Sequence, residues 1–392
     1  MDNLLKKASI LITPTAYDTS VINAIKPQSS PFADLDFTRA TAGSNVGTAN
    51  RENASGVIEQ VAQNVPRIDY TGGIAHWLIE PLSTNLITYS EDFLHSSWQH
   101  NSSLNITANA TTSPSGATNA TRVELPGSGS RMGAEIALTD EKSYTLSFYA
   151  KNNGGTANLT ATFDGQSADQ AYTITNSFAR YSFTFTATAT ETSQIRLFSG
   201  ATDIDAFIWG AQFEELSYVT SYIPTSGSTV TRAEDGFGLN TTLDTSLINS
   251  TEGTFYVEMA ALDNNLVDRN ISLSDGTNDN TIKFRYMTNS NELQVLCKKQ
   301  VNQAKFVTTS FDITNFLKIG VRFKENDFAC FVNGNELTDT ATGGSGSTFT
   351  ANTLTKIKST RGDSAFDFEG KVKCIAVFKE ILTDGELMCL TS

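Results

Sequence analysis

The chain has 392 residues, a formal net charge of −14 at pH 7 and a pI near 4.7. The length predicts two or three domains, each large enough to bury a core without disulfides. The acidity argues against a nucleic-acid partner, because a phosphate-binding surface is normally basic. The apolar run Ala8–Ile12 is too short for a signal peptide or a membrane span, and no later run reaches spanning length. We therefore expect no membrane insertion.

Residues 1–30 are predicted to be an irregular arm, because Pro14, Pro27 and Pro31 prevent long regular elements. Short strands and turns follow as far as residue 80. In the stretch IDYTGGIAHWLIE, Gly72-Gly73 can supply the positive φ that a hairpin turn needs. Because so few strands cannot bury a core alone, we expect residues 1–80 to become ordered against a partner.

A steady β pattern begins near Leu86. Short runs with alternating polarity and many Thr, Phe and Tyr residues follow at turn-separated intervals, at Tyr144–Ala150, Ala179–Ala187, Ile195–Phe198 and Asp203–Trp209. Such regular short strands are typical of an antiparallel sandwich or jelly roll. The stretch WGAQFEELSYVTSYIPTSGSTVTRAED then closes this series, and its Ser/Gly/Thr-rich part predicts a linker.

A second β series follows Asp235, with TFYVEMAAL, RNISLSDG, NTIKFRYMT, ELQVLCKK, FLKIGVRFK and DFACFVNG. Turns are predicted at Lys324–Asp327 and at Asn333-Gly334. Near the C-terminus, Thr383 and Glu386 have the spacing of a capping box, which predicts one short helix. The fold class is therefore all-β, with two antiparallel β-sandwich (jelly-roll) domains after an irregular N-terminal arm and hairpin region.

The predicted boundaries follow these patterns. We expect the arm and hairpin region at residues 1–80, the first sandwich at 81–225, a linker at 226–235 and the second sandwich at 236–392. Both sandwiches should fold independently of the arm.

Three blocks of sequence carry a resemblance to a known group. FTRATAGSNV, GVIEQVAQNVPRIDY and WLIEPLSTNLITYSEDF occur in this order, and together they resemble the amino-terminal block of many tailed-phage virion proteins. ASILITPTAYD resembles versions from phages of Bacteroidetes-type hosts. The region that ends IWGAQFEELSYVTSYIPTSGSTVTRAED is similar to the carbohydrate-binding-module-like jelly roll of those proteins.

The final region resembles their concanavalin/laminin-G-like lectin module through TFYVEM, ISLSDG, LKIGVRF, CFVNGNEL and FKEILTDGELMCLTS. Together the resemblance covers nearly the whole chain. It implies a structural protein of the virion, of fibre, spike or decoration type, assembled in the host cytoplasm. It also implies that the N-terminal region attaches to other virion proteins.

The sequence offers little for catalysis. None of the three histidines, His76, His95 and His100, lies in a nucleophile motif, and surface or turn positions are the simpler interpretation. Glu214-Glu215 is a carboxylate pair of the kind that glycosidases use, but adjacent strand residues point to opposite faces. We therefore expect no enzyme activity, no catalytic residue and no cofactor.

Two loop motifs have a functional and a structural interpretation. Ser274–Asn280, SDGTNDN, offers oxygen ligands for calcium, although ordinary loop polarity explains it more simply and the EF-hand spacing is missing. Whether this domain binds calcium stays open at this point. Arg361-Gly362-Asp363 matches an adhesion tripeptide, but Gly-Asp is ordinary turn chemistry. His and Cys residues show no zinc spacing, so we expect no metal site.

Sugar binding needs aromatic faces beside amide and carboxylate groups. Trp209 lies in an apolar run and is expected in the core, whereas Trp98 lies near a polar loop and is a candidate for sugar contact. Tyr218 and Tyr222 are expected on one face of the last strand, where they would pack against the preceding block. Trp77 carries no further signal, and the ligand-binding residues stay unknown.

The four cysteines, Cys297, Cys330, Cys374 and Cys389, all lie in the C-terminal quarter of the chain. A disulfide framework would be denser and more widely spread. We expect all four to be reduced and mostly buried, in a protein kept in a reducing cytosol until assembly.

The resemblance and the residues together predict a virion protein that binds host-surface glycans weakly through many copies. A homo-oligomer is expected because exposed strand edges and weak single-site affinity both favour assembly, and the resemblance to fibres makes a trimer the first choice. A purely architectural capsid or tail component is the main alternative, and a polysaccharide-degrading spike is a weaker one. Location in head or tail, the host and the glycan stay open.

Overall fold

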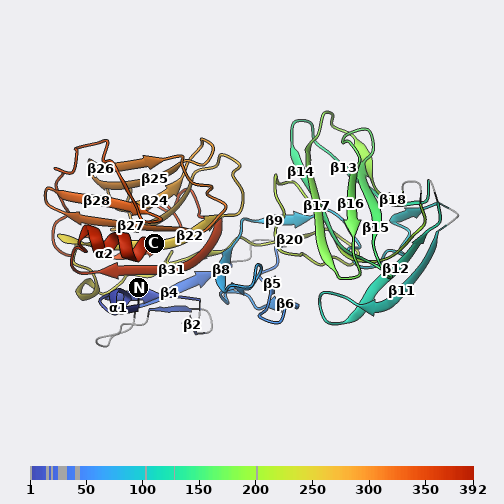
Figure 1. Ribbon diagram of the computed structural model, residues 1–392, viewed down its shortest axis with the longest axis horizontal. Coiled ribbons are helices and arrows are strands. Elements are labelled where there is room, and N and C mark those ends of the chain that lie inside the picture. Colours follow the sequence, from blue (N-terminus) through green and yellow to red (C-terminus); the bar gives the residue numbers. More distant parts are fainter. Residues whose placement is uncertain are drawn as a thin grey trace. The chain divides into compact units, whose positions relative to one another are not determined.

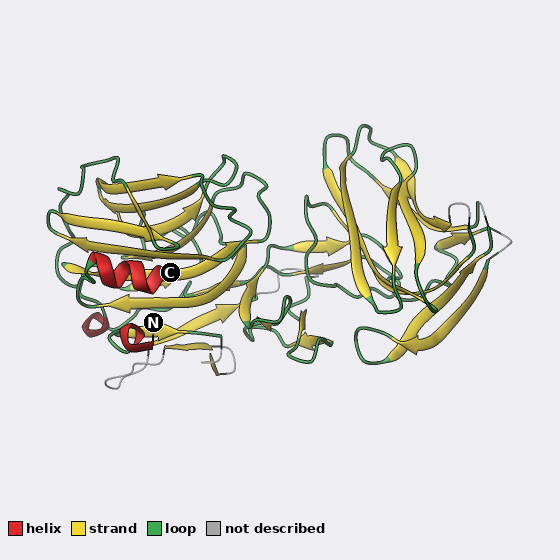
Figure 2. Ribbon diagram, viewed as in Figure 1, coloured by secondary structure: helices red, strands yellow, loops and turns green. Residues whose placement is uncertain are grey.

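The computed structural model describes residues 2–14, 17–18, 21–24, 33–39, 45–101, 104–127, 129–199 and 202–392. Pro27 and Pro31, which contributed to the expectation of an irregular arm, lie outside these residues. The named strands pair antiparallel throughout the described sheets, and the two α-helices are short (Figures 1 and 2). The predicted all-β class with antiparallel sandwiches is confirmed.

The chain forms two compact units. Unit 1 comprises residues 1–40, 61–81 and 234–392, and unit 2 comprises residues 41–60 and 82–233. The backbone therefore passes from one unit to the other at four points in the sequence, 40/41, 60/61, 81/82 and 233/234. This grouping differs from the division expected from the sequence, because both N-terminal segments of unit 1 fold together with the C-terminal sandwich.

Unit 1 contains one large sheet. Its strand order is β29-β28-β27-β22-β31-β8-β7, and β1 also pairs with β31. The bounds are β1 (Ile10–Ile12), β7 (Ile68–Asp69), β8 (His76–Ile79), β22 (Glu252–Ala261), β27 (Leu317–Lys324), β28 (Asp327–Val332), β29 (Asn335–Leu337) and β31 (Gly370–Phe378).

A five-stranded sheet forms the second layer of unit 1. A separate four-stranded sheet also contributes side chains to the core of this unit. The first has the order β26-β25-β24-β23-β30, with β23 (Arg269–Ser274), β24 (Asn280–Tyr286), β25 (Leu293–Lys299), β26 (Val301–Thr308) and β30 (Lys356–Lys358). The second has the order β2-β3-β4-β21, with β2 (Tyr17–Asp18), β3 (Val21–Ala24), β4 (Ala33–Thr38) and β21 (Gly236–Phe237). One apolar core joins side chains of all three sheets.

Strand β31 explains why the N-terminal segments belong to unit 1. Along one edge it pairs with β22. Its other edge is divided, since Gly370–Val372 pairs with β8 and Ile375–Val377 pairs with β1. Figure 1 shows the blue N-terminal strands β4 and β8 in the same unit as the red β31. The side chains of Ile10, Ile12 and Trp77 are fully buried in this core.

Unit 2 is a sandwich of two five-stranded sheets. One has the order β10-β13-β18-β15-β16, with β10 (Trp98–His100), β13 (Arg131–Ala137), β15 (Ala157–Phe163), β16 (Gln170–Ile174) and β18 (Thr192–Ser199). The other has the order β11-β12-β19-β14-β17, with β11 (Asn105–Thr112), β12 (Thr118–Leu125), β14 (Ser143–Asn152), β17 (Ala179–Thr186) and β19 (Ile204–Glu214). Alternate side chains of both sheets fill a single core.

Two small ribbons complete unit 2. They are β5 (Ala49–Glu52) with β6 (Ile58–Val61), and β9 (Ser83–Asn85) with β20 (Val230–Arg232). Residues 226–235, expected to be a linker, thus include a strand. They also include Arg232 and Asp235, which are 1% and 4% exposed. These residues are not a flexible linker because Arg232 and Asp235 have buried polar partners, Thr220 and Arg39. The Ser, Gly and Thr content of the segment does not reveal those partners.

Several local predictions are confirmed. A hairpin joins β7 to β8, with Gly72 and Gly73 at φ of +82° and +81°. β27 and β28 pair across the Lys324–Asp327 turn, and Asn333-Gly334 has positive φ at both residues between β28 and β29. The capping box of Thr383 and Glu386 starts helix α2 (Asp384–Thr391).

The other helical elements are α1 (Asp2–Leu5) and the 3-10 turn η1 (Thr245–Leu247). Within the described ranges, none of the helices is both long and apolar enough to span a membrane.

Candidate functional site

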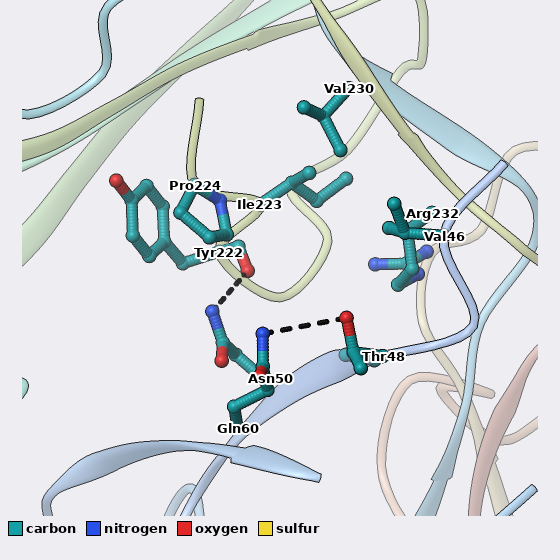
Figure 3. Close-up of a pocket in the computed structure, with 10 residues that line it drawn as sticks. Val46, Thr48, Asn50, Gln60, Tyr222, Ile223, Pro224, Val230 and Arg232 are labelled. Atoms are coloured by element: carbon teal, nitrogen blue, oxygen red, sulfur yellow. Dashed lines mark hydrogen bonds between the residues drawn. The ribbon is translucent and has the colours of Figure 1, made fainter. Parts of the chain in front are cut away.

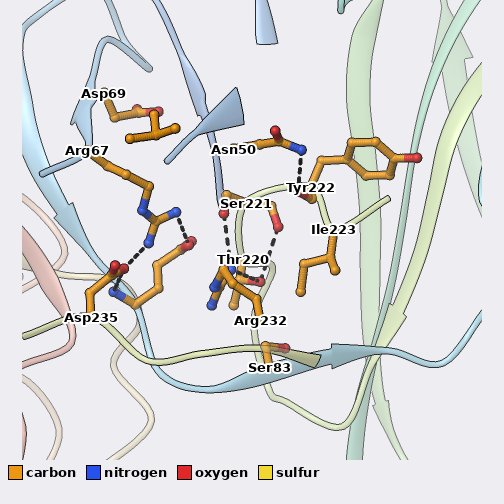
Figure 4. Close-up of polar contacts among 12 residues, drawn as sticks. Asn50, Arg67, Asp69, Ser83, Thr220, Ser221, Tyr222, Ile223, Arg232 and Asp235 are labelled. Carbon is orange, nitrogen blue, oxygen red and sulfur yellow. Dashed lines mark hydrogen bonds and ion pairs between the residues drawn. The ribbon is translucent and has the colours of Figure 1, made fainter. Parts of the chain in front are cut away.

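A buried ionic cluster lies where the segments of unit 1 begin and end. Asp235 accepts hydrogen bonds from Arg39 Nη1 at 3.0 Å and from Arg67 Nη2, and Arg67 Nη1 donates to Glu80 Oε2 at 2.6 Å. Figure 4 shows the contact between Arg67 and Asp235. All four side chains are at most 3% exposed. Arg39 and Glu80 lie just before the chain leaves unit 1, at 40/41 and 81/82. Asp235 lies just after the chain returns to unit 1, at 233/234.

Electrostatics keep this cluster charged. Burial alone would lower the pKa of Arg67, but the negative charges of Asp235 and Glu80 outweigh that effect and raise the pKa above its ordinary value. Backbone groups add further partners, because Arg39 donates to carbonyls of Val61 and Ala62 and the amide of Glu80 donates to Asp235 at 3.0 Å. The cluster therefore joins distant segments of unit 1, and its charges are used within the fold.

Unit 2 holds a second buried polar cluster around Glu214. This carboxylate is fully buried and accepts hydrogen bonds from Ser83 Oγ at 2.6 Å and from the amide of Thr220 at 3.2 Å. Arg232 Nη1 donates to Thr220 Oγ1 at 3.2 Å and to Ser221 Oγ at 3.1 Å (Figure 4). Its neighbour Glu215 lies just past the end of β19 and is exposed, so the two carboxylates lie in different surroundings, although not as alternate residues of one strand.

Unit 2 contains a small, partly enclosed hollow with a volume of about 190 Å³. It is lined by Val46, Thr48, Ala49, Asn50, Gln60, Tyr222, Ile223, Pro224, Val230 and Arg232 (Figure 3). Its polar groups bind the wall itself: Asn50 Nδ2 donates to the carbonyl of Tyr222 at 2.8 Å, and Gln60 Nε2 lies 3.4 Å from Thr48 Oγ1. The ring of Tyr222 is 3% exposed and offers no stacking face.

An open groove lies on the outer face of the sheet that contains β13, β18 and β15. Its volume is about 530 Å³, and its lining comprises Gly129, Arg131, Thr162, Asp164, Gly165, Ser167, Asp169, Arg196, Phe198 and Ser199. Strand alternation explains this lining, since Ile195 and Leu197 of β18 enter the core while Arg196 and Phe198 face outward. The cross-strand neighbour of Phe198 is Arg131, and that of Arg196 is Thr162.

A row of polar side chains holds the centre of the groove in place. Arg196 Nε donates to Gln194 Oε1 at 2.9 Å, its Nη2 pairs with Asp164, and Gln194 Nε2 donates to Gln99 Oε1 at 2.7 Å. Gly133 lies beneath this row, and a Cβ there would be only 2.2 Å from the carbonyl oxygen of Ile195. Because Gly133 has no side chain, the side-chain amides of Gln99 on β10 and Gln194 on β18 can form their hydrogen bond.

Two charged groups of the groove are available to a ligand. Among the described residues, no side chain pairs with the guanidinium of Arg131 or with the carboxylate of Asp169, and both residues are exposed. Phe198 is half-buried and lies beside Arg131. The groove therefore combines an aromatic ring with unpaired charged groups of both signs. Its hydroxyl groups are used within the fold, since Thr162 Oγ1 donates to the carbonyl of Ser167 at 3.3 Å and Ser199 Oγ donates to the carbonyl of Gly127.

The candidate aromatic residues have structural positions. Trp98 is 2% exposed, its ring lies 4.9 Å from that of Phe93, and its Nε1 donates to the carbonyl of Tyr89 at 2.9 Å. The interpretation of Trp98 as a sugar contact is therefore wrong, because core packing covers its faces. Trp209, expected in the core, is 1% exposed.

The remaining aromatic residues named in the sequence analysis are also buried. Trp77 is buried in the core of unit 1. Tyr218 and Tyr222 are buried as expected, but they follow the end of β19 at Glu214 and so do not share a strand face.

The histidines separate into two kinds. His95 lies in a turn with its ring stacked on Tyr89 at 3.5 Å, and His100 is exposed on β10. His76, in contrast, is 1% exposed, and its Nδ1 lies 2.9 Å from the carbonyl oxygen of Ile74. Burial lowers the pKa of His76. The surface or turn position expected for His76 is wrong because β8 lies between two strands and is buried on both faces.

The polar loop 274–280 uses its oxygens internally. Asp275 Oδ1 accepts from the amide of Thr277 at 2.8 Å, and Asp275 Oδ2 accepts from Asn280 Nδ2 at 2.8 Å. Lys298 Nζ lies 3.2 Å from Asp279. Across the part of the chain that the structure describes, no group of three or more His, Cys, Asp or Glu side chains is arranged to hold a metal ion.

The tripeptide Arg361-Gly362-Asp363 is also engaged with its surroundings. Arg361 Nε and Nη2 form a two-pronged pair with Asp363 at 2.7 and 2.6 Å. The guanidinium of Arg361 lies 4.6 Å from the ring centre of Phe366. Both charges of the motif thus bind each other.

All four cysteines are free, as expected. Cys297, Cys330 and Cys374 are buried, whereas Cys389 is exposed. Burial raises the pKa of the Cys374 thiol to about 12, so this group is a thiol at neutral pH.

Sequence reasoning missed the residues of the groove. Ile195-Arg-Leu-Phe198 was predicted as a strand, and its alternation alone would have placed Arg196 and Phe198 together on the solvent face. Asp164 and Asp169 carry no such signal, because they lie in the loop between β15 and β16 and only the sheet order brings them beside β18.

No protein-family model matches the chain, and no curated protein matches it. Among solved structures, the CBM40 module of the Ruminococcus gnavus IT-sialidase bound to α2,3-sialyllactose is 13% identical, over 37% of this chain and 84% of its own, at a TM-score of 0.31.

Two further solved structures are similar at this level. The CBM22-1 xylan-binding domain from Paenibacillus barcinonensis Xyn10C is 12% identical over 35% of this chain and 94% of its own, at a TM-score of 0.26. The enzymatically active domain of bacteriophage CBA120 tailspike protein 4 is 16% identical over 33% of this chain and 21% of its own, at a TM-score of 0.25.

Proposed function

We propose that this chain is a non-enzymatic structural protein of a tailed-phage particle, of fibre, spike or decoration type, that binds host-surface glycans weakly and through many copies. Glycan binding is supported mainly by the groove of unit 2. There Phe198, Arg131 and Asp169 offer the stacking and hydrogen-bonding groups that sugar recognition needs. The particle part rests on the resemblance of the ordered blocks between Phe37 and Asp235 to phage virion proteins.

The proposal that the chain is not an enzyme has support from the carboxylates. Glu214 is buried and bound by Ser83 and Thr220, while Glu215 is exposed. A glycosidase needs two carboxylates that face one bond from either side, about 5–10 Å apart with the substrate between them. This pair does not converge in that way.

We assign glycan binding to unit 2 because one face of unit 1 is covered by its own chain. Ser272 Oγ, on the outer side of β23, donates to the carbonyl of Thr360 at 2.7 Å. Lys358 Nζ donates to the carbonyl of Gly362 at 3.3 Å, and a Cβ at Gly362 would lie 1.9 Å from the carbonyl oxygen of Thr277. The loop after β30 thus lies against the sheet. This favours, for unit 1, the alternative role of an inert scaffold.

Attachment to other particle proteins is proposed for the N-terminal region, whose strands β1, β4, β7 and β8 are built into unit 1. A homo-oligomer such as a trimer would place several grooves on one particle. Binding by one groove is expected to be weak, with a dissociation constant on the order of 0.1–1 mM. Linked copies can gain about 10²–10⁴ in avidity where geometry lets them engage together.

The test uses the full chain coupled in many copies to a bead and presented to a glycan array and to host cells. The chain should bind a defined set of glycans and should compete with particles for adsorption. Cryo-electron microscopy of purified particles should show its density on the outer surface. If no glycan and no host cell binds, and particles that lack the chain adsorb normally, the architectural role would stand instead.

A further inference from the structure

We infer that the groove on the outer face of β13, β18 and β15 is the glycan site and that it takes an uncharged pyranose chain, with Phe198 as the stacking platform. This inference rests on the proposed function and names the site and the class of sugar. Four features of the groove support it: its ring, its paired polar groups, its charge balance and its size.

The ring comes first. Phe198 projects from the central strand β18 between Arg131 on β13 and Thr160 on β15. Its neighbours Leu197 and Ser199 are almost fully buried, which fixes the backbone beneath the ring. A partly exposed aromatic ring on a rigid sheet can cover the apolar C–H side of a pyranose ring, and little side-chain entropy is lost because Phe has only two rotatable bonds.

The polar groups provide the second feature. Asp164 and Arg196 are paired with each other and held by Gln194, so an acceptor and a donor stand side by side at a fixed spacing. Vicinal hydroxyl groups of a sugar need such an acceptor and donor together. Because the pair is preformed, a sugar that binds it does not have to order either side chain.

Charge balance decides the class of ligand. The lining holds two arginines and two aspartates, so its formal charges cancel. Arg196 is already neutralised by Asp164, and the carboxylate of Asp169 is exposed in the same groove. The whole chain carries a net charge of −14, which repels polyanions at long range. The unpaired guanidinium of Arg131 would attract an acidic group, but the exposed carboxylate of Asp169 in the same lining offsets that attraction. An uncharged hexose chain avoids repulsion both from Asp169 and from the net charge of the chain, whereas a uronic-acid or sulfated chain does not.

The size of the groove agrees with a small glycan ligand. Its volume of about 530 Å³ lies within the usual range for ligand sites, about 300–1,000 Å³. The enclosed hollow of about 190 Å³ in the same unit is smaller, and the amide of Asn50 binds its wall. In the groove, by contrast, the guanidinium of Arg131 and the carboxylate of Asp169 are exposed and have no side-chain partner among the described residues. The groove is therefore the better site.

The experiment compares three substitutions in the full chain. Phe198→Ala removes the proposed platform, and its matched control Phe207→Ala removes another half-buried phenylalanine, on the outward side of β19 in the opposite sheet of unit 2. Arg131→Ala removes the unpaired guanidinium. All three variants are checked for an unchanged melting temperature and circular dichroism spectrum. Each is then displayed in many copies on an array of neutral, uronic-acid and sulfated glycans.

We expect Phe198→Ala to lose at least tenfold in binding to neutral glycans, Arg131→Ala to lose about threefold to tenfold, and Phe207→Ala to bind like the wild type. Binding to neutral glycans should not change between 20 and 500 mM salt, since no net charge is exchanged. If Phe198→Ala binds like the wild type, the site lies elsewhere while the proposed function stands. Preference for acidic glycans, lost in high salt, would overturn the class. Failure of all forms to bind any glycan would count against the proposed function itself.

Discussion

Arg39 and Asp235 lie 196 residues apart in the sequence and form a fully buried ion pair, with Nη1 3.0 Å from Oδ1. Arg67 shares the same carboxylate, so residues from all three segments of unit 1 meet at Asp235. If that carboxylate is lost, the two guanidinium groups stay buried, and water cannot reach them to replace the lost negative charge. The cluster thus makes the folding of unit 1 depend on segments from both ends of the chain.

The first prediction concerns this carboxylate. Asp235→Asn leaves Arg39 and Arg67 buried with less negative charge, and we expect the free energy of unfolding of unit 1 to fall by about 3–5 kcal/mol. The matched control is Glu252→Gln, whose partner Lys324 lies 3.1 Å away at the surface. That variant should lose no more than about 1 kcal/mol. Urea titration of both variants, followed by tryptophan fluorescence, measures the difference. Equal effects would contradict the role of the cluster.

The second prediction concerns a fragment of residues 82–392. It lacks Ile10, Ile12 and Trp77 from the core and leaves β31 without two of its partners. Loss of these three side chains and of β8 removes on the order of 10 kcal/mol of burial, which is comparable to the whole stability of a domain. We therefore expect unit 1 of this fragment to be unfolded, although the sequence alone suggested independent sandwiches.

The control for this prediction is the fragment of residues 82–233. The main core of unit 2 contains no residue from positions 1–81, so this fragment should keep its fold. Hydrogen exchange of the longer fragment should show protection in unit 2 and none in residues 234–392. Full protection of residues 234–392 would show that the N-terminal strands are dispensable.

The third prediction is a pH dependence that comes from Lys283, which is 3% exposed. Burial, reinforced by the charge of Arg285, lowers its pKa from an ordinary value of 10.5 to about 8. Between these two values the unfolded chain binds more protons than the folded one, so this lysine's contribution to the free energy of unfolding rises with pH. Below pH 8 the buried charge destabilises the fold.

Lys283→Met should therefore raise the free energy of unfolding at pH 7 by about 1–3 kcal/mol. The gain should shrink steadily as the pH rises from 8 to 10.5. Lys324→Met, at a surface position, serves as the control and should show no such trend. Denaturant titrations at several pH values measure both. A gain for Lys283→Met that stays constant with pH would contradict the prediction.

The fourth prediction concerns thiol reactivity. Only Cys389 is exposed among the four free cysteines, and burial raises the pKa of the thiol in Cys297, Cys330 and Cys374. Iodoacetamide at pH 8 should label one site per folded chain, and all four in denaturant. Mass spectrometry of the labelled peptides identifies the site. Rapid labelling of Cys297 in the folded chain would contradict the buried position.

Local features of the fold could be predicted from the sequence because neighbouring residues determine them. The capping box at Thr383, the Gly72-Gly73 turn and the alternation along Tyr144–Ala150 are of this kind. Strand β11 gave no usable signal, since its Asn, Thr and Ala residues are mostly exposed and polar. A strand that buries little has little hydrophobic pattern to detect.

Long-range pairing could not be predicted. Ile10–Ile12 reads as a short apolar run, and nothing near it indicates that its partner is Ile375–Val377. The same holds for Arg39, whose charge predicts exposure unless the carboxylate of Asp235 is known to lie beside it. For the groove, alternation can identify Arg196 and Phe198, but the meeting of β18 with Asp164 depends on the strand order.

The most direct test of the account is the adsorption of phage particles that carry Phe198→Ala in this chain, compared with particles that carry Phe207→Ala. Particle content of the chain is checked first by quantitative mass spectrometry, so that only binding is compared. If the chain is a glycan-binding particle protein with its site in the groove, Phe198→Ala particles should adsorb to host cells at least several-fold more slowly than Phe207→Ala particles. Equal adsorption rates, at equal content of the chain, would contradict it.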